Sequence, residues 1–114
     1  MIAVIFELTP APGKAEEYFR LGAALKAEVE KFDGFISIER FESVTNPGKF
    51  VSISFWRDEQ AVHAWRNVEG HRTAQARGRG SVFADYRLRV ASVIRDYSMN
   101  ARDEAPADSR HKHG

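Results

Sequence analysis

The sequence contains no cysteine, so disulfides, thiolate catalysis and cysteine-ligated zinc or iron–sulfur sites are excluded. It also lacks an excess of either charge, because 17 basic and 16 acidic residues leave a formal net charge of +1. Such a balance suggests neither nucleic-acid binding nor attraction to a membrane surface. No apolar run approaches the roughly 18 residues of a membrane span, and the N-terminus lacks a signal peptide's basic region. We therefore expect a cytoplasmic protein with no nucleic-acid or membrane partner.

The length of 114 residues predicts a single domain, and its 43% hydrophobic and 29% charged content is ordinary for a globular protein. The composition changes after Ser98, because large apolar residues almost disappear from the last segment. Segments of this kind cannot bury enough apolar surface to become ordered. We expect a folded domain over residues 1–97 and a flexible polar tail over residues 98–114.

Hydrophobic periodicity and turn residues together predict the order of helices and strands. Apolar residues at alternate positions indicate strands, and apolar residues three and four apart indicate helices. Helix ends are predicted from Asp at an N-cap and from glycines that follow a helix. The expected elements are a strand at Ile2–Leu8, a helix at Lys14–Phe32, strands at Phe35–Val44 and Phe50–Trp56, short helices at Asp58–Asn67 and His71–Arg77 separated at Gly70, and a strand at Tyr86–Tyr97.

This β-α-β-β-α-β order predicts an α+β, ferredoxin-like fold, with a four-stranded antiparallel sheet and helices on one face. The strand at Ile2–Leu8 is apolar on both faces, although helices cover only one face of such a sheet. The strand at Phe50–Trp56 also carries large apolar residues on both faces. A second apolar face would be a large exposed patch in an isolated domain. We therefore expect a homodimer that packs sheet against sheet, with Trp56 directed toward the dimer core.

The segment from Phe55 to Gly80 is the candidate site, because it combines both tryptophans with several polar side chains. Aromatic surface beside convergent polar groups is typical of a small-molecule pocket. Trp65 and Trp56 could stack on a ring, Arg72 could hold an anion, and Tyr86 could donate a hydrogen bond. Each residue also has a structural alternative, as core aromatic, solvated charge or half-buried strand tyrosine.

Short motifs along residues 1–97 resemble those of the antibiotic biosynthesis monooxygenase superfamily of dimeric α+β barrels. The matching motifs are Phe32-Asp33-Gly34-Phe35, Ser54-Phe55-Trp56, Asp58-Glu59 with Ala61 and Trp65, and His71-Arg72 with Ala74-Gln75. The resemblance implies a pocket between helices and sheet in each protomer. It also implies cofactor-independent oxidation of aromatic phenols or quinols, or haem cleavage, or binding of metabolites without catalysis.

In haem-cleaving members, the resemblance implies an Asn on the first strand, a Trp on the second helical region and an axial His further along. Here Glu7 stands at the Asn position, Trp65 matches the Trp, and Gln75 stands where the His is expected. Two of three positions depart from the haem-cleaving pattern, which leaves His71 or His63 as the alternative haem ligand. No spacing in the sequence predicts a metal site.

Two residues are candidate acid–base groups. His71 can titrate near neutrality and could deprotonate a phenol. Glu7 is the only charge in an otherwise apolar strand, and a buried, unpaired carboxylate has the raised pKa of an acid–base group. We expect Glu7 to face Trp65 and His71 across a pocket, with an ion pair to Arg40, Arg87 or Arg89 as the alternative.

Three functions remain open at this point. The first is a cofactor-independent monooxygenase of a small aromatic, phenolic or quinol-type metabolite. The second is a haem-binding or haem-degrading protein. The third is a non-catalytic dimeric module that binds a metabolite or serves in stress.

Overall fold

The structure is a computed structural model that describes residues 1–77 and 82–113, with the side chains of residues 69–77 and 113 outside the description. It confirms the expected α+β, ferredoxin-like fold. The elements are β1 (Ile2–Pro10), α1 (Ala15–Val29), β2 (Phe35–Glu42), β3 (Phe50–Trp56), α2 (Glu59–Arg77), β4 (Phe83–Ser92) and α3 (Ala107–His113). Four strands form one sheet in the order β2-β3-β1-β4, and all neighbouring pairs are antiparallel.

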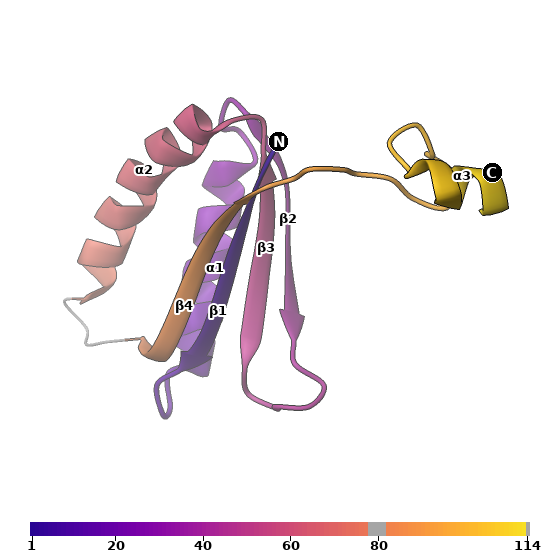
Figure 1. Cartoon of the computed structure of the whole chain (residues 1–114). Helices are drawn as coiled ribbons and strands as arrows, with labels where there is room; N and C mark the ends of the chain where they lie inside the picture. The colour runs from indigo at the N-terminus through magenta and orange to yellow at the C-terminus, as the bar shows by residue number, and fades with distance from the viewer. Residues whose placement is uncertain (78–81, 114) are drawn as a thin grey trace.

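Figure 1 views the sheet from the side that no helix covers, with α1 behind it and α2 beside β4. The register of the strands shows which side chains share each face. Ile2, Val4 and Leu8 contribute to the apolar clusters that contain helix residues, so this parity of β1 faces the helices. The other parity places Ile5 beside Ile53 of β3 and Arg89 of β4 on the uncovered side. We call that side the open face.

Trp56 lies on the helix-facing side, which corrects the expectation that it faces a dimer core. Its side chain is almost fully buried with Val29 of α1 and with Val62 and Trp65 of α2. The indole N–H of Trp56 donates a hydrogen bond of 2.9 Å to Oγ of Ser54 on the same side of β3. Because its polar group has a partner inside the protein, Trp56 is suited to a core position.

Helix α2 is continuous from Glu59 to Arg77, so the predicted break at Gly70 is wrong. Asp58 caps its start, since Oδ1 of Asp58 accepts the backbone N–H of Ala61 at 2.9 Å. A glycine inside a helix costs only about 1 kcal/mol relative to alanine, and the residues around Gly70 are mostly good helix formers. One helix of 19 residues therefore replaces the two short ones.

Strand β4 ends at Ser92, five residues before the predicted end. The last residue pair in the register of the two strands is Ile2 of β1 with Ser92 of β4. The last backbone hydrogen bond there joins the N–H of Val93 to the carbonyl of Met1 at 3.0 Å. Beyond this point the chain leaves the sheet, and α3 forms in the segment where we expected no regular structure. In the described residues, no helix combines the length and apolar character that crossing a membrane requires.

Candidate functional site

The most distinctive surface on the helix-facing side is a row of exposed apolar side chains along β4. Tyr86, Leu88 and Val90 are 60%, 46% and 44% exposed. They pair in register with Leu8, Phe6 and Val4 of β1, which pack toward the helices, so the row lies on the same face as the core. We call Tyr86, Leu88 and Val90 the β4 strip.

The position of α2 explains why the β4 strip remains exposed. α2 packs against α1 and β3, and its first half contributes Ala61, Val62 and Trp65 to the core. In Figure 1 the helix then continues beside β4, with its C-terminal end away from the strand. Because α2 packs on α1 and β3, the β4 strip remains exposed.

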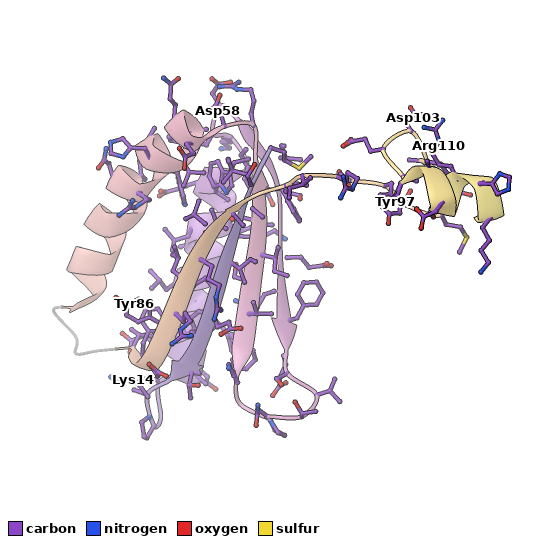
Figure 2. The ribbon with its side chains drawn as sticks, in the orientation of Figure 1. Lys14, Asp58, Tyr86, Tyr97, Asp103 and Arg110 are labelled. Carbon is purple, nitrogen blue, oxygen red and sulfur yellow. The ribbon has the colours of Figure 1, made fainter. Side chains whose placement is uncertain are left out.

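Aromatic rings hold the lower end of the strip in place. The ring of Tyr86 meets Phe6 of β1 with centroids 5.7 Å apart, and it meets Phe83 at 6.0 Å. Figure 2 shows Tyr86 at the lower end of β4. Its hydroxyl makes no hydrogen bond with another described residue, and ring contacts of this kind fix the orientation of the side chain. Tyr86 therefore offers a polar group beside an apolar surface.

Trp65 belongs to the core more than to the wall of a site. It is buried, and its ring packs edge-on against Phe32 at 5.4 Å and lies 6.3 Å from Trp56. Val68, three residues later on the same helix, is only partly buried and touches the same cluster. The two tryptophans thus belong to the core, and the described side chains of the candidate site come from β4.

Glu7 lies on the open face, so it does not face Trp65 across a pocket as the sequence suggested. Oε2 of Glu7 is 3.4 Å from Arg89 of β4 and 3.8 Å from Lys49. The ion pair with Arg89 is one of the alternatives that the sequence left open. With its charge compensated by two cations, Glu7 has the surroundings of a structural carboxylate.

Three predicted site residues, His71, Arg72 and Gln75, lie on the second half of α2, and their side chains are outside the described part of the chain. Figure 1 draws this half of α2 on the β4 side of the molecule, diverging from the strand that carries Tyr86. It does not bring them to Glu7, because Glu7 is on the other face of the sheet. The α2 backbone and the β4 strip thus delimit the candidate site.

A buried phenol that the sequence did not single out is Tyr18 of α1. Burial raises the pKa of Tyr18, while a hydrogen bond with Arg40 and the charge of Arg40 act in the opposite direction. The guanidinium of Arg40 lies 5.3 Å above the ring of Tyr18 and 4.8 Å above that of Phe19. Gly22 makes room for it, because a Cβ there would lie 2.9 Å from Nη1 of Arg40. In the structure, Arg40 of β2 lies on the helix-facing side of the sheet. Its contact with α1 could not be predicted from the alternation of β2.

A second charged cluster joins the start of β2 to the start of α2. Arg57 pairs with Asp33 at 3.2 Å and with Asp58 at 3.0 Å. Hydrogen bonding with Arg57 lowers the pKa of Asp33, and the backbone N–H of Ala61 followed by Arg57 lowers the pKa of Asp58. Both carboxylates raise the pKa of Arg57. The cluster is exposed. Figure 2 labels Asp58 at the end of the sheet opposite Tyr86, so the cluster lies away from the candidate site. Its role is to join two elements.

Metal chemistry has no support in the described side chains. Over residues 1–77 and 82–113, apart from the side chains outside the description, no group of three His, Asp or Glu residues could hold a metal ion. The described part of the site instead presents apolar surface and one phenol. Such an arrangement can bind an aromatic or alicyclic ring and hydrogen-bond to an oxygen substituent on it.

Comparison with known proteins gives consistent matches. Residues 1–77 match a protein-family model described as antibiotic biosynthesis monooxygenase. The chain is 41% identical over 100 residues to a protein of Pyricularia oryzae named jasmonate monooxygenase ABM, and the match covers 88% of the chain and 46% of that relative. The chain thus spans about half the length of this curated relative.

Two solved structures share the fold. PA3566 from Pseudomonas aeruginosa is 25% identical with a TM-score of 0.68, and the match covers 82% of this chain and 93% of that one. Rv0793 from Mycobacterium tuberculosis is 22% identical with a TM-score of 0.73, covering 85% of this chain and 98% of that one. The fold described above is therefore the fold of these proteins over nearly their whole length.

Proposed function

This chain belongs to the antibiotic biosynthesis monooxygenase family, and on that premise we propose that it is a cofactor-independent monooxygenase of a small aromatic, phenolic or quinol-type metabolite. The observation that carries the proposal is the β4 strip. Three apolar side chains remain exposed on the side of the sheet that normally forms the core, and one of them ends in a hydroxyl group without a described partner. Exposed apolar surface in this position supports a binding role.

The chemistry requires little from the protein. An activated CH₂ group beside a phenol loses a proton, and the resulting carbanion reacts with O₂. One oxygen atom remains as a carbonyl, the other leaves as water, and the substrate carbon supplies all four electrons. No external reductant is then needed. The protein contributes a dry surface, a base and a donor to the developing oxyanion.

We assign these tasks to residues around the β4 strip. Leu88 and Val90 pack against the ring system, and the hydroxyl of Tyr86 donates a hydrogen bond to the oxyanion. His71 remains the proposed base, because its residue type titrates near neutrality. Arg72 follows Trp65 by seven residues, so its backbone position lies on the same face of α2 as that of Trp65. Arg72 and Gln75 are the proposed polar partners of the substrate.

Oxygen consumption tests this proposal directly. Purified protein is mixed with anthrone-type compounds, hydroquinones and jasmonate, the compound in the relative's name, in the presence of a chelator and without flavin. We expect uptake of O₂ above background and a product that has gained one oxygen atom and lost two hydrogen atoms. Leu88→Asp should reduce the rate at least tenfold, because an unpaired carboxylate in the strip opposes binding of an apolar ring.

The matched control is Val44→Asp, at an almost fully exposed position outside the strip. It should leave the rate unchanged, and melting curves of both variants establish that they are folded. Equal rates for the two variants, or no O₂ uptake with any compound on the panel, would overturn the proposal.

We also propose that the protein acts as a homodimer through the open face. The centre of this face consists of Ile5, Val51, Ile53 and Phe55, all partly exposed in the isolated chain. An apolar centre of this kind supports burial against a partner. Sedimentation velocity at micromolar concentration should give a dimer, and a monomer would contradict this part of the proposal.

A further inference from the structure

The chain beyond the sheet forms a projecting arm, which we define as residues Val93 to His113. After its hydrogen bond to Met1, the arm runs across the upper ends of β3 and β2 in the view of Figure 1 and ends in α3, clear of the other elements. The radius of gyration is 16.6 Å, whereas about 13 Å is expected for a compact domain of this length. The arm thus extends away from its own domain.

The end of the arm is held together by its own side chains. Nη1 of Arg102 donates to the carbonyl of Ser98 at 3.2 Å, and Nη2 donates to Oγ of Ser109 at 2.6 Å. The same guanidinium lies 5.3 Å above the ring of Tyr97, and Ala105 is buried in the centre. We call residues 97–109 the terminal knob. It has a defined shape, yet Figure 2 shows its Tyr97, and Arg110 directly after it, well away from the sheet.

Apolar side chains of the arm have little cover within their own chain. Ile94, between the sheet and the knob, is 80% exposed, and Met99, within the knob, is 88% exposed. Ordering an extended segment costs conformational entropy that contacts must offset. A second protein surface is the natural source of those contacts.

The open face indicates which surface this is. One row across it runs Glu39, Ile53, Ile5 and Arg89 from β2 to β4, and the next row runs Phe41, Val51, Glu7 and Arg87. The β2 edge therefore carries the acidic Glu39, the β4 edge carries two arginines, and the centre is apolar except for Glu7, whose charge is compensated within its own chain. Glu39 and Arg87 have no ion-pair partner among the described residues.

Such a face is complementary to itself in one orientation. A two-fold axis parallel to the strands lays β2 of one copy over β4 of the other, so Glu39 meets the partner's Arg89 and Ile53 meets the partner's Ile5. A two-fold axis across the strands would instead bring Glu39 close to the partner's Glu39. Opposite charges favour the first orientation, and like charges disfavour the second.

The first orientation also determines where the arm leads. The arm leaves its own domain beyond the β2 edge, and this is the edge over which the partner's β4 lies. The strand β4 is itself an edge strand, and its upper end carries Val90 of the β4 strip.

We propose that two copies pack through their open faces with Glu39 against the partner's Arg89, and that each terminal knob docks at the β4 edge of the partner, beside Val90. The candidate site of each protomer is then completed by the other chain. This inference rests on the proposed homodimer and not on the proposed reaction.

The absence of cysteine makes a cross-linking test clean. One copy carries Met99→Cys and the co-expressed copy carries Val90→Cys with a purification tag, and a short bis-maleimide is added. We expect a cross-linked pair that contains both chains. In the control, the tagged copy carries Val44→Cys in place of Val90→Cys. Val44 lies in the turn at the other end of the sheet, so the cross-link should be abolished.

Each contrary result has a distinct meaning. A dimer by sedimentation without this cross-link overturns the arm exchange and leaves the dimer intact. A cross-link within a single chain that carries both substitutions shows that the knob folds back, and this also overturns the exchange. A monomer overturns the exchange and the dimer together, while O₂ uptake remains a separate readout of the proposed reaction.

A charge reversal tests the orientation of the two copies. Glu39→Arg should weaken dimerisation at least tenfold, because it places like charges together, and adding Arg89→Glu should restore it. Dimerisation that is unchanged or strengthened by Glu39→Arg alone would contradict the proposed axis.

Discussion

Glu7 and Arg89 form an ion pair of 3.4 Å between neighbouring strands, on the sheet face that no helix covers. The carboxylate of Glu7 therefore points away from Trp65 and from the β4 strip, which lie on the other face of the sheet. The sheet therefore divides the molecule in two. Its helix-facing side carries the candidate site, and its open face carries the charges that we assign to dimerisation.

Replacing Glu7 by Gln tests this division. We expect O₂ uptake per folded protomer to change less than twofold, because the carboxylate faces away from the site. Stability should fall by only about 1 kcal/mol or less, since partly exposed ion pairs contribute little. The measurements are initial rates and urea unfolding. A rate loss of tenfold or more with an unchanged melting curve would return Glu7 to the catalytic site.

Ser54 and Trp56 form a buried side-chain hydrogen bond that we expect to contribute measurably to stability. Ser54→Ala leaves the indole N–H of Trp56 without its partner, which should cost about 1–3 kcal/mol. Trp56→Phe removes the donor together with part of the ring, so it creates a small cavity without an unpaired polar group. The double variant should be less destabilised than the sum of the single ones. Strict additivity in urea unfolding would contradict the coupling.

Gly34 is required both for its backbone conformation and for close packing. Its φ is 88°, and a Cβ at this position would lie 2.5 Å from Cβ of Ala61 in α2. Gly13 is the matched control, because its φ is 75° and a Cβ there would have no neighbour within 4 Å. Gly13→Ala should cost about 1–2 kcal/mol from backbone strain alone. Gly34→Ala should cost about 1–3 kcal/mol more, from overpacking, and equal losses would contradict this account.

The Arg57 cluster should make the protein sensitive to acid. The pKa of Asp33 and of Asp58 lies below the ordinary value of 3.8 in the folded state. A lowered folded-state pKa contributes stability that is present above pH 3.8 and is lost as the pH falls through the folded-state value. Asp33→Asn should therefore flatten the dependence of the melting temperature on pH below about 4. An unchanged slope would show that the pairing has no effect in solution.

A hemin titration tests whether the protein works without haem. Gln75 stands where haem-cleaving relatives are expected to carry their histidine, so we expect no stoichiometric shift of the Soret band. His71→Ala and His63→Ala are the control variants, because His71 and His63 are the two candidate ligands on α2. A one-to-one shift that disappears in either variant would replace the cofactor-independent proposal by a haem protein.

The fold could be predicted from the sequence wherever one local signal dominated. The alternation in Phe50–Trp56 gave both ends of β3 correctly, and the helical stripe gave α1. The break at Gly70 was wrong, because a single glycine costs too little to end a helix whose first half is anchored in the core. The end of β4 was also wrong, since it depends on pairing with the start of β1, which the apolar pattern of β4 does not record.

The candidate site was harder to predict than the fold. Alternation along a strand divides its residues into two sets but does not show which set faces the helices. Trp56 and Glu7 were each assigned to the wrong face for this reason. The exposure of Leu88 and Val90 depends on where α2 lies relative to the sheet, which no local pattern records. Tyr86 was identified from its residue type, and the structure places it in the β4 strip.

The central claim is that the substrate binds along the β4 strip, and methyl NMR tests it most directly. Isoleucine, leucine and valine methyl groups are labelled, and a non-reactive analogue such as anthraquinone is titrated. The account predicts saturable shifts for Leu88 and Val90, with Ile5, Val51 and Ile53 on the open face unaffected. Shifts confined to the open-face methyl groups, or no saturable shift at Leu88 and Val90, would contradict it.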